Sequence, residues 1–167
     1  MKVFLASDHA GFDLKEKIRI HLQNKGYEIE DCGASVFNKD DDYPDFISKA
    51  AEGVSNDQES RGIILGGSGQ AEAIVANKFP NVRCALFYSP AVPVQAADVT
   101  GRISTDPFEM IRLTREHNDA NMLSLGARFL KEEDALRVVD LWLETAFSGD
   151  ERHVRRLNKI KKFENGK

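Results

Sequence analysis

Cysteine and proline are scarce in this chain of 167 residues, and it contains no long hydrophobic run. Its two cysteines, Cys32 and Cys84, form no disulfide framework and lack the spacing of a metal site, so each is interpreted as a free structural thiol. Apolar runs such as 62–65 are far too short to cross a bilayer. The first residues lack the regions of a secretory signal. We therefore expect a cytoplasmic protein with no membrane partner.

The excess of acidic over basic residues is small. The net charge of −4, from 27 acidic and 23 basic side chains, argues against nucleic acid as the main partner. A composition of 41% hydrophobic and 30% charged residues is typical of a globular protein. The length fits one domain, residues 1–167, and neither repeats nor low-complexity segments divide it.

Short apolar runs alternate with longer amphipathic patterns along the chain. The runs predict strands at 3–6, 27–32, 61–65, 82–88 and 122–125, and helices at 12–24, 44–54, 68–77, 131–147 and 151–163. Strands separated by helices imply a parallel sheet that is covered on both faces. Residues 89–106 contain Pro90, Pro93 and Gly101 and predict a long loop. Such a loop is either a lid or interface element, or a solvated insertion without function.

Ligands of parallel α/β folds gather beyond the carboxyl ends of the strands. Three polar clusters are predicted at those ends: Ser7-Asp8-His9, Gly66-Gly67-Ser68 and the segment around His117.

The segment Gly66-Gly67-Ser68-Gly69-Gln70-Ala71-Glu72 joins a predicted strand to a predicted helix. Its backbone amides can bind negative charge, but it is neither a Walker A loop nor a dinucleotide fingerprint. Ser68 and Glu72 are four residues apart and are expected to share a helix face. Either Ser68 caps the helix and Glu72 complements its dipole, or Glu72 is a base beside an anion hole. The second reading suits proton abstraction next to a carbonyl, with the amides holding the enediolate oxygen.

The remaining candidates are single residues or short basic runs. Asp8 either caps the next helix or contacts a ligand, and His9 can donate to an anion. His117 is either structural or a proton-transfer group, which its ordinary pKa permits. Arg152 and Arg156 lie one helical turn apart and either form a solvated basic tail or clamp a phosphate, with Arg128 as a further phosphate ligand.

Taken together, six segments in one order resemble the ribose-5-phosphate isomerase B family, which also includes galactose-6-phosphate isomerase subunits. The segments are Ser7 to Gly11, Asp42 to Asp45, Gly66 to Glu72, Ala76 to Lys78, Glu116 to Asn121 and Gly149 to Arg156. The resemblance covers nearly the whole chain.

The resemblance implies a Rossmann-like three-layer α/β/α sandwich with a five-stranded parallel sheet. It also implies a homodimer, or a dimer of dimers, with sites built across the interface. The implied activity, in the pentose phosphate pathway, interconverts ribose 5-phosphate and ribulose 5-phosphate through an enediolate, without a metal or cofactor. Alternatives are an isomerase of allose 6-phosphate or galactose 6-phosphate, a non-catalytic sugar-phosphate-binding module, and a flavodoxin-like electron carrier.

The resemblance also assigns roles to residues. Glu72 would be the catalytic base, His117 would open the furanose ring, and Ser68 would assist the anion hole. The substrate-binding set would comprise Asp8, His9, Tyr43, Gly67, Ser68, Gly69, Gln70, Ala71, Asn118, Arg128, Arg152 and Arg156, with His153 nearby.

The chain departs from the family pattern at three places. Many members carry a cysteine base where Leu65 or Gly66 stands here, so this chain resembles the branch in which a glutamate takes over. Ala71 occupies a position where glycine is common. The connection 89–106 is longer than the family's usual link to the histidine-bearing helix.

Overall fold

The computed structural model describes residues 1–164, in which eleven elements alternate along the chain. They are β1 (Lys2–Ser7), α1 (Phe12–Asn24), β2 (Glu28–Asp31), α2 (Pro44–Asn56), β3 (Arg61–Gly66), α3 (Gln70–Ala76), β4 (Cys84–Phe87), α4 (Glu109–Glu116), β5 (Met122–Gly126), α5 (Glu132–Glu144) and α6 (Glu151–Glu164).

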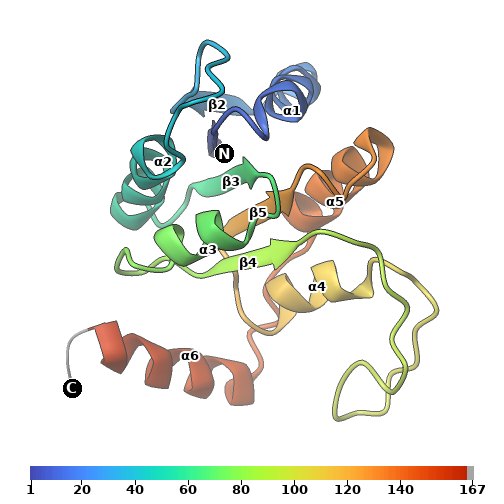
Figure 1. Cartoon of the computed structure of the whole chain (residues 1–167). Helices are drawn as coiled ribbons and strands as arrows, with labels where there is room; N and C mark the ends of the chain where they lie inside the picture. Colours follow the sequence, from blue (N-terminus) through green and yellow to red (C-terminus); the bar gives the residue numbers. More distant parts are fainter. Residues whose placement is uncertain (165–167) are drawn as a thin grey trace.

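The strands form one parallel sheet in the order β2-β1-β3-β5-β4. Because neighbouring residues of a strand point to opposite faces, each strand contributes to two cores. Val3, Leu5 and Leu65 pack on the face covered by α1, α4 and α5, whereas Phe4 and Ile64 pack on the face covered by α2 and α3 (Figure 1). The predicted three-layer sandwich with a five-stranded parallel sheet is therefore confirmed.

Helices α3 and α4 differ most from the sequence prediction, and α5 ends at Glu144, three residues before its expected end. The helix expected from residue 68 begins at Gln70, because Gly69 adopts a left-handed backbone with φ of 75°. Helix α4 lies where the periodicity assigned no element. Its buried face includes Glu109 and Arg115 beside Ile111, and these buried charges hide the apolar pattern of the helix.

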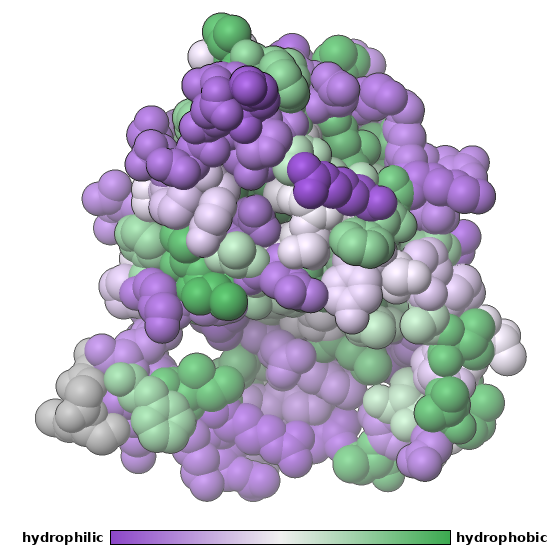
Figure 2. Space-filling view, in the orientation of Figure 1, coloured by the Kyte–Doolittle hydropathy of each residue, from purple (hydrophilic) through white to green (hydrophobic). Residues whose placement is uncertain are grey.

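The insertion, defined here as residues 89–106, contains neither a helix nor a strand. It extends beyond α4 and exposes apolar side chains, which Figure 2 shows gathered at one corner of the molecule. The exposed fractions are 97% for Val94, 79% for Val99 and 76% for Ile103. No helix among residues 1–164 has the length and apolar character to cross a membrane.

Helix α6 stands apart from the sheet, beneath the edge strand β4 (Figure 1). His153 is its one buried residue among those described. A groove of about 750 Å³ separates α6 from the body of the chain and is hollowed visibly in Figure 2. Phe79, Val82, Leu157 and Ile160 are among the apolar side chains that line this groove.

Candidate active site

The glycine-rich turn follows β3 and precedes α3, as expected. Gly69 is held in place by the Ser124 hydroxyl, which donates to its carbonyl oxygen at 2.6 Å. A side chain at Gly69 would collide with Leu86 and with the backbone of Leu125, so the turn packs directly on β5. Ser68 lies before the helix, and its Oγ accepts a long contact of 3.4 Å from the Gln70 amide. The turn is thereby fixed at the carboxyl end of β3.

Glu72 occupies the first turn of α3 and is only 4% exposed. Its carboxylate lies against Gly66, where an added Cβ would overlap it, and its Oε2 atom has no hydrogen-bond partner within the described chain. Burial raises the pKa of Glu72, and the negative charge of Asp8 adds to the rise. This carboxylate, which forms no ion pair among the described residues and has a raised pKa, suits the acceptance and return of a proton near neutral pH.

The expected shared helix face of Ser68 and Glu72 is wrong, because Ser68 lies outside α3. Glu72 nevertheless reaches the glycine-rich turn. It does so because α3 begins immediately after the left-handed Gly69 and folds back over the end of β3.

The raised pKa of Glu72 makes stability depend on pH in a defined direction. The folded state holds this proton more tightly than the unfolded state, so stability falls as pH rises from the ordinary value of 4.5 through the folded pKa. We expect Glu72→Gln to melt a few degrees higher than the parent chain at pH 8 and to lose this advantage below pH 4.5. Thermal melts of both proteins across this range measure the difference. A Glu72→Gln protein that is less stable at pH 8 would contradict it.

Asp8 and His9 follow β1 at the same edge of the sheet. The Asp8 Oδ1 atom accepts the Ala10 amide at 3.0 Å, and α1 begins later, so Asp8 forms a local turn rather than the helix cap. His9 Nδ1 lies 2.7 Å from Asp41 Oδ1, which also accepts the His9 amide at 3.1 Å. Asp41 thereby orients the imidazole.

Sequence reasoning missed Asp41, which directly precedes the segment Asp42 to Asp45. Within residues 1–164, Asp8, His9 and Asp41 form the group whose potential metal-ligating atoms converge, all within 4.8 Å of one another. The hydrogen bonds from His9 to Asp41 account for this arrangement.

Arg128 and Tyr43 complete this first group. The Arg128 amide donates to the Gly67 carbonyl at 3.1 Å, and its guanidinium lies over Gly67, 3.3 Å from the position of an added Cβ. Tyr43 caps α2 and packs, half-buried, against the core on that face. Both side chains therefore lie on elements that end or begin near the turn.

His117 lies elsewhere. The prediction that it joins the other clusters at the carboxyl ends is wrong, because α4 runs back across the sheet and ends before β5 begins. Its neighbours confirm this position, since the Asn121 side chain and amide bond to Asn81 and Arg83 at the amino end of β4.

The second group of candidates surrounds His117. Its ring lies 4.2 Å from the ring of His153 on α6, and His153 Nδ1 is 2.9 Å from the Ser148 hydroxyl. Burial lowers the pKa of His117, and His153 adds to the effect, so the imidazole is neutral near pH 7. Asn118 is exposed at the groove.

The two arginines of α6 belong to the same group. Arg152 is partly buried, and its Nε atom lies 3.7 Å from the Asp150 carboxylate without a hydrogen bond. Arg156 is exposed one turn further along. The first group of candidate residues therefore lies at the carboxyl ends of the strands, and the second group lies at the amino ends.

Comparison with known proteins identifies the family of this chain. The sequence model of the family described as Ribose/Galactose Isomerase matches residues 3–100 and 103–160. This chain belongs to that family. Ribose-5-phosphate isomerase B of Mycolicibacterium paratuberculosis is 41% identical over 164 residues, which cover 98% of this chain and 92% of the relative. The enzyme of the same name from Mycobacterium tuberculosis is 42% identical over 98% of this chain and 90% of its own length.

Solved structures of family members match equally well. Ribose-5-phosphate isomerase B of Mycoplasma genitalium, solved with bound ribulose-5-phosphate, superposes with a TM-score of 0.85 at 33% identity, covering 99% of this chain and 97% of the other. The Clostridium thermocellum enzyme gives a TM-score of 0.83 at 38% identity, with 99% of each chain covered. The family resemblance expected from the six sequence segments is confirmed.

Proposed function

We propose that this isomerase-family chain interconverts ribose 5-phosphate and ribulose 5-phosphate through an enediolate. The observation that carries the proposal is the Glu72 carboxylate, buried and unpaired against a glycine-rich turn. The relatives named ribose-5-phosphate isomerase B support the choice of substrate. The setting that follows is the cytoplasmic pentose phosphate pathway.

In the proposed reaction, Glu72 removes the proton from C2 of the open-chain aldose phosphate. The amides of residues 67–71 and the Ser68 hydroxyl stabilise the negative charge that develops on the carbonyl oxygen. A proton passes from the C2 hydroxyl to the C1 oxygen within the enediolate, and the same carboxylate returns a proton to C1, which gives the ketose. Asp8 and His9, the latter oriented by Asp41, contact the sugar from the end of β1. Tyr43 lines the pocket, and Arg128 contributes positive charge over the turn.

We further propose that the active enzyme is a homodimer in which each site combines the two groups of residues from different copies. One copy supplies Glu72 and the turn. The other supplies His117 to open the furanose ring, Asn118 to hold a hydroxyl, and Arg152 and Arg156 to bind the phosphate. The separation of these groups to opposite ends of the strands supports this arrangement.

The surface around β4 supports a second copy as the occupant of the groove. Strand β4 is an edge strand, and such edges are usually covered in stable proteins. Ile74 on the neighbouring α3 is 62% exposed, and Ile160 and Phe163 on α6 are 48% and 78% exposed. Ile160 and Phe163 line the groove, and Ile74 lines a neighbouring hollow that shares Asn77 and Lys78 with it, so the apolar surface continues across α3 as a homodimer interface requires.

An isomerase assay on the purified full-length protein, with a chelator present, tests the proposed reaction. Ribose 5-phosphate, allose 6-phosphate and galactose 6-phosphate are compared by kcat/KM. We expect the chelator to leave the turnover of each substrate unchanged. We expect the highest kcat/KM with ribose 5-phosphate. A higher kcat/KM with a six-carbon sugar phosphate would make that compound the proposed substrate in place of ribose 5-phosphate. Tight binding without turnover would favour a non-catalytic module.

A further inference from the structure

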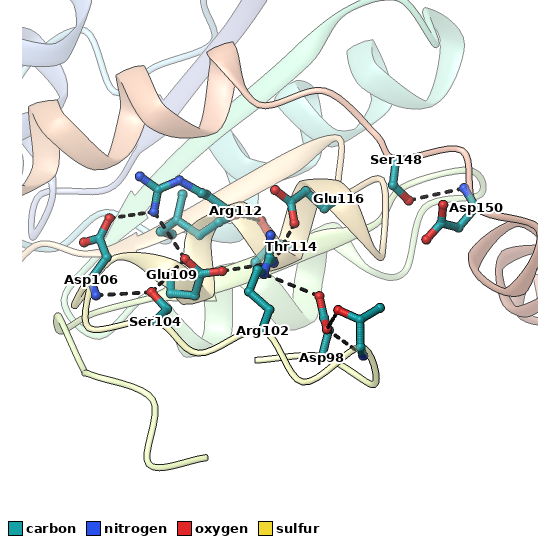
Figure 3. A network of polar contacts seen from close by, with 12 residues as sticks. Asp98, Arg102, Ser104, Asp106, Glu109, Arg112, Thr114, Glu116, Ser148 and Asp150 are labelled. Carbon is teal, nitrogen blue, oxygen red and sulfur yellow. Dashed lines mark hydrogen bonds and ion pairs between the residues drawn. The ribbon is translucent and has the colours of Figure 1, made fainter. Parts of the chain in front are cut away.

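The insertion is fastened to helix α4 through Arg102. The Arg102 Nη2 atom donates to Glu116 Oε2 at 2.8 Å and lies 3.0 Å from Glu109 Oε1, while its Nε atom is 3.4 Å from Asp98 within the insertion (Figure 3). Glu109 and Glu116 are seven residues apart, so they project from the same side of α4. One guanidinium therefore connects the insertion with both ends of the helix that precedes His117.

The surroundings of Arg102 are rich in carboxylates. Arg112 pairs with Asp106 at 2.6 Å and with Glu109 at 3.5 Å, and the Ser104 hydroxyl donates to Glu109 at 3.1 Å. Glu109 is only 5% exposed, which makes its loss of a partner costly. Both arginines contact Glu109, but only Arg102 also reaches Glu116 at the far end of the helix (Figure 3).

Glu116 is also joined to the second group of site residues. It directly precedes His117, and its backbone carbonyl accepts the Ser148 amide at 3.2 Å. The Ser148 hydroxyl is bonded to His153, whose ring faces that of His117. A change in the position or charge of the Glu116 side chain would therefore act directly beside His117.

Four charged or titratable groups influence the His117 ring. They are Glu116 from α4, His153 and Arg152 from α6, and Arg102 from the insertion. Glu116 is the one that favours the protonated imidazole, and the other three disfavour it. Arg102 acts twice, because it brings its own positive charge and compensates the negative charge of Glu116.

We propose that Arg102 is a positioning residue, which pairs the Glu116 carboxylate so that His117 is kept as a neutral imidazole for ring opening. The role of His117 rests on the proposed function. The pairing assigns a catalytic purpose to the insertion. The competing explanation is that Arg102 only holds the insertion against α4. In that case its loss would lower the stability of the fold without changing the titration of His117.

The test uses Arg102→Gln in the full-length protein, with the titration of His117 followed by NMR. The chain has four histidines, and comparison with His117→Asn identifies the resonance. We expect His117 in Arg102→Gln to become protonated at higher pH than in the parent protein. The kcat/KM profile should fall roughly threefold at its acid end and remain unchanged at its alkaline end, because only the unprotonated imidazole acts as a base.

Arg112→Gln is the matched control, since it removes a charge from the same network but not from Glu116. It should lower the melting temperature and leave the His117 titration in place. The double variant Arg102→Gln/Glu116→Gln should return the titration to its original position. The proposal would be overturned if His117 titrated at the parent pH in a folded Arg102→Gln protein. It would also be overturned if Arg112→Gln shifted the His117 titration by the same amount as Arg102→Gln.

If Arg102→Gln does not fold, the titration of His117 in the single variant Glu116→Gln provides a second test. Here His117 should titrate at lower pH, because the Arg102 charge persists while the carboxylate is gone; an upward shift or no shift would refute the pairing. The NMR titration is independent of turnover. Failure of the parent protein to isomerise sugar phosphates would therefore refute the proposed function and leave the titration result readable.

Discussion

Glu72→Gln is expected to reduce isomerisation of ribose 5-phosphate by roughly a hundred- to ten-thousand-fold, the usual contribution of a positioned general base. Glutamine keeps the size of the side chain and fits the space beside Gly66, but its amide cannot accept the C2 proton. The loss should therefore appear in kcat, with KM little changed. Steady-state kinetics in both directions, together with exchange of the C2 proton with solvent, measure the effect.

Glu133→Gln is a suitable control for this experiment, because Glu133 is exposed on α5 and belongs to neither group of candidate residues. It should retain the parent kcat and exchange rate. Near-normal rates of both isomerisation and C2 exchange in Glu72→Gln would remove this carboxylate from the mechanism. Loss of isomerisation with normal exchange would restrict its role to proton delivery at C1.

Mixing two inactive variants is expected to restore activity. In a two-fold symmetric dimer, a heterodimer of Glu72→Gln and His117→Asn contains one site with both substitutions and one site with neither. If subunits pair at random, half of the dimers are heterodimers with one intact site, so about a quarter of the parent activity should return. Activity should return because Glu72 lies at the carboxyl ends of the strands and His117 at the amino ends, so that each proposed site takes these residues from different copies.

Co-expression of the two variants with different affinity tags allows the heterodimer to be purified through both tags. The purified heterodimer should have about half of the parent activity per dimer, since one of two sites is intact. A heterodimer of Glu72→Gln with the double variant Glu72→Gln/His117→Asn has no intact site and serves as the inactive control. Absence of any recovery in the first heterodimer would show that each site belongs to a single copy.

Local patterns in the sequence determined most of the secondary structure. The α1 helix was predicted with its observed bounds, and all five strands were found, four of them because they are short apolar runs between polar turns and β2 because Tyr27 and Ile29 alternate with acidic residues. Helix α4 was missed, since its buried face combines Ile111 with Glu109 and Arg115. The charges on that face are satisfied by polar partners outside the helix, such as Arg102 for Glu109 and the Thr145 carbonyl for Arg115. A local pattern cannot reveal such partners.

The chemical identity of the candidate site was also accessible from the sequence. The glycine-rich turn with Glu72, the Asp8-His9 pair and the arginines near the C-terminus are contiguous motifs, so their residue types and order alone indicated the family. The sequence-based reason for Glu72 was wrong, however, because Ser68 is outside the helix and the spacing of four residues creates no shared face.

The sequence by itself therefore determined the parallel α/β class, the family and the residue types of the site, because these depend on short-range periodicity and on contiguous motifs. Only the tertiary structure decided that Glu72 is buried against Gly66 with its Oε2 atom unpartnered, and that His117 lies at the amino ends of the strands. It also decided that Arg102 of the insertion pairs with Glu116. Each of these facts depends on which segments the crossover connections bring together and on the direction in which each helix runs. A local sequence pattern contains no information about either.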